Sequence, residues 1–431
     1  MPKFIVEGGH PLNGTVHIHG SKNASLPILA ATLLTSEPIT LHNVPDISDV
    51  HAFLDILRGF GTEANFESGT ITIQTTKIIR TNAPEELVKR MRASILLLGP
   101  VLARAGEIEM VFPGGCVLGK RSVHAHTHAL SKLGAEITET ETGLRAKADR
   151  LKGTHVIMAE ASVTATENAI MAAVLAEGKT KIHWAAMEPH VQDLCHFLNE
   201  MGAKITNIGT PTLTIEGVSE LHGTEYTVTS DYLEVGTLAL AALLTRGEVK
   251  LENIVSEHLD SFWEKLEEAG APVELTANSV TLKPLPKGQH FKAVESLKTA
   301  VFPGFATDLQ APFVILLTQA EGESRVFETL FEGRLNYLLE LEKMGAKVDL
   351  HNPQQATIHG PSKLKGASII SCDIRAGAAM VLAALTAEGT TEISDIRYID
   401  RGYEQLDETL RQLGAKIERV ELETKTVRDF I

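Results

Sequence analysis

The stretch Leu198-Asn-Glu-Met-Gly-Ala-Lys-Ile-Thr-Asn-Ile208 decides the fold, because its pattern recurs along the chain. An apolar residue leads into Gly-Ala, and polar and apolar residues alternate after it. Glycine can take the left-handed conformation that ends many helices, and alternation with a period of two is typical of a strand. The pattern therefore predicts a helix that ends near Gly202, followed directly by a strand.

This pattern occurs six times, which indicates an internal repeat. Successive repeat glycines are 73, 68, 68, 75 and 69 residues apart, and the first copy is the weakest. These glycines are Gly61, Gly134, Gly202, Gly270, Gly345 and Gly414. Between them an alanine-rich run recurs that usually ends in Glu-Gly and leads into a β-branched stretch, as in Ala169–Gly178. One unit of about 70 residues buries too little surface to be stable alone, so we expect two α/β domains of three units each.

The composition limits the kinds of partner that the chain can have. Its net charge is -15 over 431 residues, which argues against nucleic-acid binding because a phosphate backbone needs a basic surface. The chain has three cysteines, Cys116, Cys195 and Cys372. This small and odd number argues against a disulfide framework. No apolar run is long enough for a signal peptide or a membrane span. We therefore expect a cytoplasmic protein without nucleic-acid or membrane partners.

Three motifs are spread over the whole chain: Gly20-Ser-Lys-Asn-Ala24, Phe112-Pro-Gly-Gly-Cys-Val-Leu-Gly119 and Ile399-Asp-Arg-Gly-Tyr-Glu404. With them the sequence resembles the enolpyruvyl transferases, and among these the branch that uses UDP-N-acetylglucosamine as acceptor. The resemblance implies an α/β (α+β) fold, an inside-out α/β barrel in two domains with six repeats. It places repeats 1–3 and the Cys116 loop in residues 22–231. Repeats 4–6 fall in residues 1–21 and 232–431, and the ligands lie in the cleft between the domains.

The reaction implied by the resemblance transfers the enolpyruvyl group of phosphoenolpyruvate to the 3-hydroxyl of UDP-N-acetylglucosamine and releases phosphate. It is the first committed step of peptidoglycan synthesis. The implied partners are these two small molecules, protein partners are unknown, and no cofactor is expected. His124, His126 and His128 have a spacing that could suit a metal, but no carboxylate or cysteine follows at metal-binding spacing. We therefore predict no metal site.

Phosphoenolpyruvate is a strongly charged anion, so its site must gather cations within an acidic chain. An arginine fork can bind a carboxylate or a phosphate through two hydrogen bonds. Any one of these side chains could be a solvated surface residue, but their occurrence in matching motifs favours a site. By resemblance, the residues that bind phosphoenolpyruvate are Lys22, Asn23, Arg121, Arg334, Arg375 and Arg401.

The resemblance also implies three catalytic residues. Lys22 lies in a small-residue turn before an apolar helix, a favourable place for an anion. Cys116 lies in a glycine-rich loop over residues 112–121 that is expected to close over the site. It would protonate the methylene carbon and would be the thiol alkylated by fosfomycin. Asp308 would contact the sugar hydroxyl and act as the base, although a lone aspartate after a turn is often only a cap. Cys195, in an amphipathic helix, is predicted to be buried filler.

The acceptor half departs from the family pattern at several positions. The family usually has an aspartate at position 124, a lysine or another residue at 160, a glycine at 164 and an arginine at 187. This chain has His124, Glu160, Thr164 and Met187. Two alternatives therefore stay open: a paralogous enolpyruvyl transferase that acts on a different nucleotide or sugar nucleotide, and an inactive paralogue that only binds ligands. The implied sugar-nucleotide site consists of Arg92, Arg121, Ser122, Val123, His124, Ala125, Ser162, Val163, Asp308 and Leu330.

Overall fold

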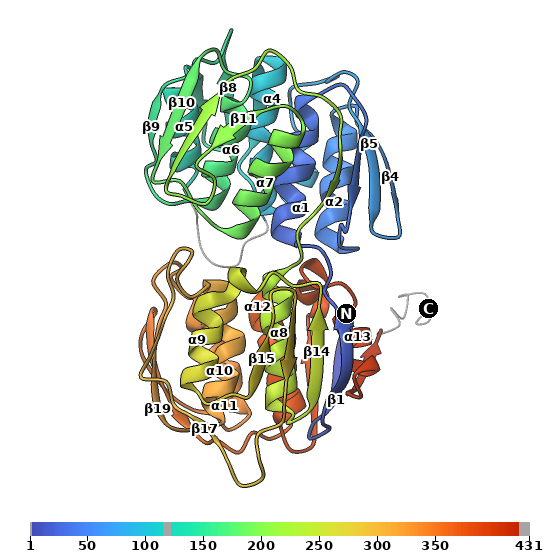
Figure 1. The fold of residues 1–431 in the computed structure, drawn as a ribbon, viewed down its shortest axis with the longest axis vertical. Helices are drawn as coiled ribbons and strands as arrows, with labels where there is room; N and C mark the ends of the chain where they lie inside the picture. Colours follow the sequence, from blue (N-terminus) through green and yellow to red (C-terminus); the bar gives the residue numbers. More distant parts are fainter. Residues whose placement is uncertain (1, 115–121, 422–431) are drawn as a thin grey trace, which may run out of the picture. The chain divides into compact units, whose positions relative to one another are not determined.

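The computed structural model describes residues 2–114 and 122–421, and the chain divides into two compact units (Figure 1). Unit 1 comprises Met1–Ile18 and Tyr232–Ile431, and unit 2 comprises His19–Asp231. The domain boundaries expected from the sequence are 21/22 and 231/232, so the first crossing lies slightly earlier in the structure. Each unit has its own apolar core, and the two clusters of buried side chains have no member in common.

Unit 2 contains three sheets among its described residues. Their strand orders are β13-β3-β5-β4, β11-β12-β10-β9 and β6-β8-β7. The helices of unit 2 are α1 (Lys22–Ala31), α2 (Ser48–Gly59), α3 (Glu85–Val88), α4 (Leu98–Ala105), α5 (His124–Lys132), α6 (Val163–Ala173) and α7 (Pro189–Glu200), with 3-10 turns η1 (Thr32–Leu34) and η2 (Arg92–Leu97). Its strands are β3 (Ile39–His42), β4 (Glu63–Glu67), β5 (Thr70–Gln74), β6 (Glu107–Val111), β7 (Glu136–Glu139), β8 (Gly143–Lys147), β9 (His155–Ile157), β10 (Lys179–His183), β11 (Lys204–Thr206), β12 (Thr212–Glu216) and β13 (Glu225–Thr227).

Unit 1 repeats this plan, again with three sheets among the residues described. Their strand orders are β22-β23-β1-β24, β15-β16-β14-β2 and β17-β19-β21-β20, and β18 also pairs with β19. The helices are α8 (Tyr232–Leu244), α9 (Asp260–Glu268), α10 (Gln310–Thr318), α11 (Leu338–Lys343), α12 (Ile374–Thr386) and α13 (Leu406–Gln412), with 3-10 turns η3 (Ser256–Leu259), η4 (Thr307–Leu309), η5 (Arg334–Tyr337) and η6 (Ile396–Arg401). The strands are β1 (Lys3–Glu7), β2 (Asn13–His17), β14 (Glu248–Glu252), β15 (Val273–Leu275), β16 (Ser279–Leu282), β17 (Phe291–Lys292), β18 (Ser296–Lys298), β19 (Ala320–Phe327), β20 (Lys347–Asn352), β21 (Gln355–Gly360), β22 (Ser368–Ile370), β23 (Thr390–Ser394) and β24 (Lys416–Val420).

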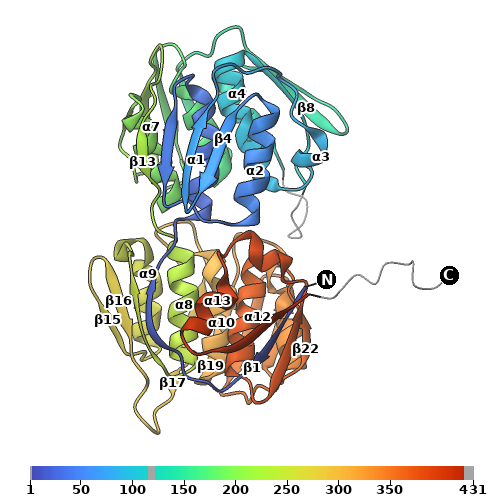
Figure 2. The ribbon, with the colours of Figure 1, turned by 90° about the vertical axis from the view of Figure 1, so that its right-hand side faces the viewer.

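The central helices of each unit lie inside, and the sheets lie outside (Figure 2). Every residue of α8 and of α10 is buried, which is expected for a helix that is apolar on all sides. Helices α8, α10 and α12 pack against one another in unit 1, and α6 packs against α4 and α1 in unit 2. This arrangement agrees with the inside-out α/β fold that the sequence predicts.

The repeat glycines end their helices as predicted. All six have a positive φ, between 73° at Gly270 and 105° at Gly414. A strand follows each of them within the next few residues, namely β4, β7, β11, β15, β20 and β24. The pattern at residues 198–208 therefore predicted the helix end and the strand in every copy, including the weak copy at Gly61.

The chain crosses between the units twice, through two segments that are hydrogen-bonded to each other. The Asp231 N–H donates to the His19 carbonyl at 2.9 Å, and Gly20 forms an antiparallel bridge with Ser230. A Cβ atom at Gly20 would lie 1.5 Å from the carbonyl oxygen of Asn43, so this position requires glycine. Before the first crossing, β1 lies between β23 and β24, which joins the start of the chain to unit 1.

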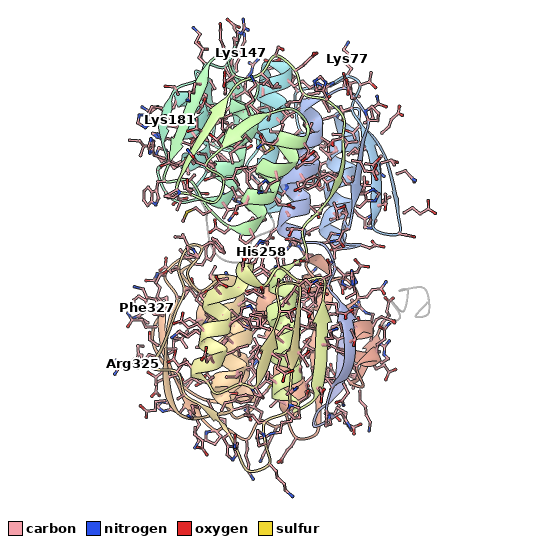
Figure 3. The ribbon with its side chains drawn as sticks, viewed as in Figure 1. Lys77, Lys147, Lys181, His258, Arg325 and Phe327 are labelled. Carbon is pink, nitrogen blue, oxygen red and sulfur yellow. The ribbon has the colours of Figure 1, made fainter. Side chains whose placement is uncertain are left out.

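The outer surface of both units is rich in charged side chains. Lys77, Lys147 and Lys181 of unit 2 and Arg325 of unit 1 point outward from the sheets and loops (Figure 3). In the part of the chain that the structure describes, no helix has the length and apolar character needed to cross a membrane.

Candidate active site

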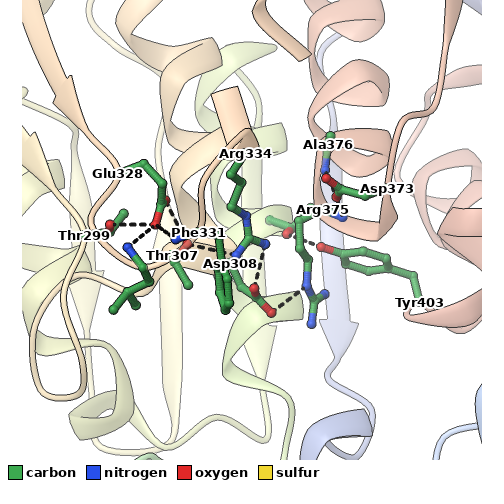
Figure 4. A network of polar contacts seen from close by, with 12 residues as sticks. Thr299, Thr307, Asp308, Glu328, Phe331, Arg334, Asp373, Arg375, Ala376 and Tyr403 are labelled. Carbon is green, nitrogen blue, oxygen red and sulfur yellow. Dashed lines mark hydrogen bonds and ion pairs between the residues drawn. The ribbon is translucent and has the colours of Figure 1, made fainter. Parts of the chain in front are cut away.

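In unit 1, Asp308 lies between two arginines that come from distant parts of the sequence (Figure 4). Arg334 Nη2 donates to Asp308 Oδ1 at 2.7 Å, and Arg375 Nε donates to Oδ2 at 3.2 Å. The two arginine side chains are 4% exposed, whereas the Asp308 side chain is 29% exposed. The carboxylate is therefore the most exposed member of the cluster.

Local structure explains these positions. Asp308 lies in η4, immediately before α10, and Arg334 opens η5. Arg375 is the second residue of α12, whose N-cap, Asp373, accepts the N–H groups of Arg375 and Ala376 at 2.8 Å each. Three helical turns thus carry the cluster at their N-terminal ends, where the backbone N–H groups favour anions.

The carboxylate of Glu328 accepts hydrogen bonds from the segments that precede and follow Asp308 in the sequence. It is fully buried, and its Oε1 accepts from the Thr299 hydroxyl at 3.1 Å and from the Leu330 N–H at 2.9 Å. Its Oε2 accepts from the Thr307 hydroxyl at 2.8 Å, and Arg334 Nη1 donates to the same hydroxyl oxygen at 2.8 Å. This network fixes the Arg334 fork toward Asp308.

Aromatic rings support both guanidinium groups. The Arg375 guanidinium carbon lies 5.0 Å from the centre of the Tyr403 ring, and that of Arg334 lies 5.4 Å from the Phe331 ring. The Tyr403 hydroxyl is 2.8 Å from Thr237 Oγ1, whose own proton goes to the Leu233 carbonyl. The rings limit how far the guanidinium planes can turn, so an anion meets forks that are already oriented.

The electrostatics of Asp308 combine two opposing effects. Burial alone would raise its pKa, but the positive charges of Arg334 and Arg375 and their hydrogen bonds hold the pKa well below its usual range. Asp308 is therefore ionised at neutral pH and strongly paired. In this arrangement it is a weak base, which bears directly on the base role predicted from the sequence.

Two other predicted residues of unit 1 lie in the surrounding segments. Leu330 is 39% exposed, and its N–H is bound by the buried Glu328. Arg401 is the last residue of η6 and is half-buried. From the predicted set, the structure brings Asp308, Arg334 and Arg375 into direct contact.

In unit 2, Lys22 is the first residue of α1. The sequence predicted that Lys22 lies in a turn before the helix, but the helix already begins at this lysine. The Ser21 side chain caps this helix by accepting the Ala24 N–H at 3.3 Å. Lys22 Nζ forms an ion pair with Asp49 Oδ2 at 2.8 Å, and both side chains are less than a tenth exposed. Asn23 follows in the same helical turn and is half-buried.

The described residues of the predicted sugar-nucleotide site in unit 2 lie at or next to the starts of η2, α5 and α6. Arg92 Nη2 donates to the Ser122 carbonyl at 3.1 Å, and the Ser122 hydroxyl oxygen accepts the His124 N–H at 3.0 Å. Val123 is the N-cap of α5, and Ala125 is buried in its first turn. Ser162 is the N-cap of α6, and Val163 is its first residue. Arg92 and Ser122 are therefore brought into contact.

Cys116 and Arg121 lie outside the described residues, as does the loop that contains them beyond Gly114. Cys195 lies in α7 and is fully buried, as the sequence predicts for a filler residue, and burial raises the pKa of its thiol. The rings of His124 and His128 are 5.9 Å apart. Among the residues described, no group of three or more His, Cys, Asp or Glu side chains could hold a metal ion.

Several residues of these clusters escaped the sequence analysis. Asp49 and Glu328 are buried carboxylates with no motif of their own, and only packing brings them to Lys22 and Thr307. Asp373 could have been found, because it precedes Arg375 in a pattern typical of a helix N-cap.

Comparison with known proteins identifies the family. The family described as EPSP synthase (3-phosphoshikimate 1-carboxyvinyltransferase) matches residues 6–410. The chain is 46% identical over 423 residues to a UDP-N-acetylglucosamine 1-carboxyvinyltransferase of Methylacidiphilum infernorum, covering 97% of this chain and 99% of the relative. It is 45% identical over 428 residues to UDP-N-acetylglucosamine 1-carboxyvinyltransferase 2 of Carboxydothermus hydrogenoformans, covering 97% and 100%.

Solved structures agree on the fold. The enolpyruvyl transferase NikO from Streptomyces tendae superposes with a TM-score of 0.88 at 24% identity, covering 97% of this chain and 99% of NikO. EPSP synthase from Acinetobacter baumannii gives a TM-score of 0.73 at 19% identity, covering 98% and 100%. With full-length relatives at 46% identity and a family match over most of its length, the chain belongs to the enolpyruvyl transferase family.

Proposed function

We propose that this enzyme transfers the enolpyruvyl group from phosphoenolpyruvate to the 3-hydroxyl of UDP-N-acetylglucosamine and releases phosphate, the first committed step of peptidoglycan synthesis. The observation that carries the proposal is the full-length similarity, at 46% identity, to a protein named for this reaction. The cluster of Asp308, Arg334 and Arg375 supports it, because it offers an acceptor of protons and two fixed forks for an anion.

The reaction that we propose is an addition followed by an elimination. The acceptor hydroxyl loses its proton to Asp308 while its oxygen bonds to the central carbon of phosphoenolpyruvate. The methylene carbon gains a proton from Cys116. Loss of a proton from the resulting methyl group and departure of phosphate then restore the double bond. Lys22, Asn23 and the arginines, including Arg121 and Arg401, are proposed to bind the phosphate and carboxylate of the donor throughout.

Asp308 can act as a base only if its pKa rises when substrate binds. An anionic substrate is a competing partner for the guanidinium groups of Arg334 and Arg375. Each contact that moves from the carboxylate to the substrate removes a positive neighbour and therefore raises the Asp308 pKa toward its usual range. Binding of the donor thus prepares the base, and Asp308 does not take up a proton from water before the donor arrives.

Lys22 faces a similar exchange in unit 2. Its ammonium pairs with Asp49 in a site where both side chains are almost fully buried. A buried ion pair has a desolvation cost that its Coulomb attraction offsets only in part, so a phosphate or carboxylate can compete for the ammonium. We propose that Lys22 contacts the donor and that Asp49 positions the lysine at the start of α1.

The acceptor is the part of the proposal that most needs a test, because His124, Glu160 and Met187 depart from the usual family residues. Phosphate release from phosphoenolpyruvate should be measured with UDP-N-acetylglucosamine, UDP, UMP, UDP-glucose and shikimate 3-phosphate. Fast release with UDP-N-acetylglucosamine alone is the expected result. Phosphate release with another nucleotide, but not with UDP-N-acetylglucosamine, would assign a different acceptor. If none of the five compounds leads to phosphate release, a protein that only binds ligands is favoured.

The small number of cysteines supports a cytoplasmic location as part of the proposal. No protein partner is proposed.

A further inference from the structure

A buried chain of hydrogen bonds in unit 2 begins at Asn168 of α6, which is fully buried. Its Oδ1 accepts the Gly99 N–H at 2.6 Å, and its Nδ2 donates to the Ile95 carbonyl at 2.8 Å. One backbone partner is a donor and the other is an acceptor, so exchanging the amide oxygen and nitrogen would break both bonds. The orientation of the Asn168 amide is therefore fixed.

This amide decides which nitrogen of His126 carries the proton. Asn168 Nδ2 lies 2.9 Å from His126 Nδ1 and donates its second hydrogen to it, so Nδ1 is the acceptor. Burial and, to a lesser degree, the charge of Arg92 lower the pKa of His126 to about 3. The imidazole is neutral at pH 7, and its single proton is on Nε2.

The proton on Nε2 in turn determines the direction of the Thr164 hydroxyl. His126 Nε2 lies 3.2 Å from Thr164 Oγ1 and donates to it. The hydroxyl proton must then point away from the imidazole, since a hydroxyl has only one proton to donate. No acceptor for this proton is found among the residues that the structure describes, and Thr164 is half-exposed. The surface thus carries a donor that is oriented from inside the protein.

The surroundings of this donor favour an anionic ligand. His126 is in the first turn of α5 and Thr164 is in the first turn of α6, so two helix N-termini meet at their contact, and neither first turn has an acidic residue. Arg92 is close enough for its charge to act on His126. The two carboxylates nearest in sequence are Glu167, which is buried within α6, and Glu160, which is exposed on the segment before it. Burial raises the pKa of Glu167 well above its usual value, which favours its neutral form.

We propose that Thr164 donates its hydroxyl proton to a phosphate oxygen of the acceptor's diphosphate, and that His126 and Asn168 are positioning residues that hold this hydroxyl. The inference rests on the proposed function and adds a residue that determines acceptor affinity. The Ala186 N–H donates to Thr166 Oγ1 at 3.0 Å, so the segment that leads to Met187 lies against the same end of α6. Thr164 thus supplies a diphosphate contact near the position where the family usually has an arginine.

The first test uses the full-length enzyme with Thr164→Val, which keeps the shape of the side chain and removes its hydroxyl, and with Thr164→Ser, which keeps the hydroxyl. Loss of one hydrogen bond to a charged group should raise the acceptor KM about tenfold in Thr164→Val. The values of kcat and of KM for phosphoenolpyruvate should stay within about twofold, because the contact is made equally before and during the reaction. Thr164→Ser should restore the acceptor KM.

The second test asks whether His126 acts through Thr164. His126→Phe should raise the acceptor KM in the wild-type background but have no further effect in the Thr164→Val background, as a double-mutant cycle measures. Equal effects of His126→Phe in both backgrounds would overturn the positioning role. If Thr164→Val loses its cooperative thermal transition, Thr164→Ala replaces it as the variant without a hydroxyl.

An acceptor KM that changes less than twofold in the hydroxyl-free variant would overturn the inference. Calorimetric binding of UDP separates this failure from a failure of the proposed function. If the wild type does not turn over UDP-N-acetylglucosamine but binds UDP about tenfold more tightly than Thr164→Val does, the proposed function fails and the inference stands. Equal binding of UDP, or no binding to either protein, would overturn the inference as well.

Discussion

At the scale of single residues, Asp308 has two tasks that oppose each other. A carboxylate that neutralises two buried guanidinium groups is a poor proton acceptor, because the same positive charges that stabilise it also lower its pKa. A base that becomes active only when an anion binds would avoid proton abstraction in the empty site.

Asp308→Asn should lower kcat for phosphate release by a factor of about 10² to 10⁴, because an amide cannot take up the proton of the sugar hydroxyl. The variant should still unfold cooperatively, since the amide oxygen can accept one of the two arginine contacts. Asp349→Asn, at an exposed aspartate of β20 paired with His359, is the matched control and should keep its kcat. A kcat for Asp308→Asn within tenfold of the wild type would remove Asp308 as the base.

The low pKa of Asp308 predicts how folding stability depends on pH. In the unfolded chain an aspartate has a pKa of about 3.9, and in the folded protein the Asp308 pKa lies lower. The unfolded state therefore binds the proton first as the pH falls, and the stabilisation by the ionised form is lost below about pH 4. It is fully present above about pH 5.

Urea unfolding of the wild type and of Asp308→Asn at several pH values would measure this contribution. The difference in unfolding free energy between the two proteins should be constant from about pH 5 to 8 and should shrink below about pH 4. A difference that already shrinks between pH 7 and 5 would mean that the Asp308 pKa is raised, contrary to the ion pairs in the structure.

At the scale of elements, the helix ends were predictable and the side-chain partners were not. A glycine after an apolar run, followed by alternation, is a local signal, and it located six helix ends and six strands. The pairing of Lys22 with Asp49 depends on how α1 packs against α2, which no local pattern encodes. For the same reason the sequence predicted Arg334 and Arg375 as site residues but not their contacts with Asp308.

The same local signal makes a stability prediction at Gly270, which follows α9. Its φ is 73° and no atom lies within 4 Å of an added Cβ, so a substitution there tests backbone strain without a clash. Gly270→Ala should lower the unfolding free energy by about 1 kcal/mol, because a residue with a Cβ is strained at positive φ. Gly270→Asn should lose less, because asparagine tolerates this conformation better than alanine does.

Chemical denaturation of the two variants and of Glu267→Ala, a control at an exposed position of α9, would measure these effects. The control should stay within about 0.5 kcal/mol of the wild type. Equal losses for alanine and asparagine at position 270 would contradict a helix end that depends on the left-handed conformation.

A common element-scale rule also links the two candidate clusters. Lys22, Thr164 and Arg375 occupy the first or second position of α1, α6 and α12, and Asp308 lies in the turn before α10. The interiors of these helices are almost entirely buried, so only their ends are available for polar chemistry. The repeat thus separates the residues that form the core from those that can meet a ligand.

At the scale of the whole molecule, sequence order and structural unit do not coincide. The first eighteen residues add β1 and β2 to sheets formed by the second half of the chain. Three-residue ladders such as β22 with β23 could not be predicted from the sequence, because their partners are set by the packing of whole repeats. The number of repeats, by contrast, followed from counting glycines.

Because unit 2 is one continuous segment with its own core, residues 19–231 expressed alone should fold. Unit 1 is interrupted, but Asp231 and His19 are hydrogen-bonded at the crossing, so a short glycine linker between Ile18 and Tyr232 should reconnect it. Each fragment should show one cooperative thermal transition, as single domains usually do. Neither should release phosphate from phosphoenolpyruvate, because Lys22 is in one fragment and Asp308 is in the other.

A fragment 19–231 without a cooperative transition would show that the core of unit 2 depends on unit 1. Phosphate release by either fragment alone would mean that the proposed catalytic residues do not act together.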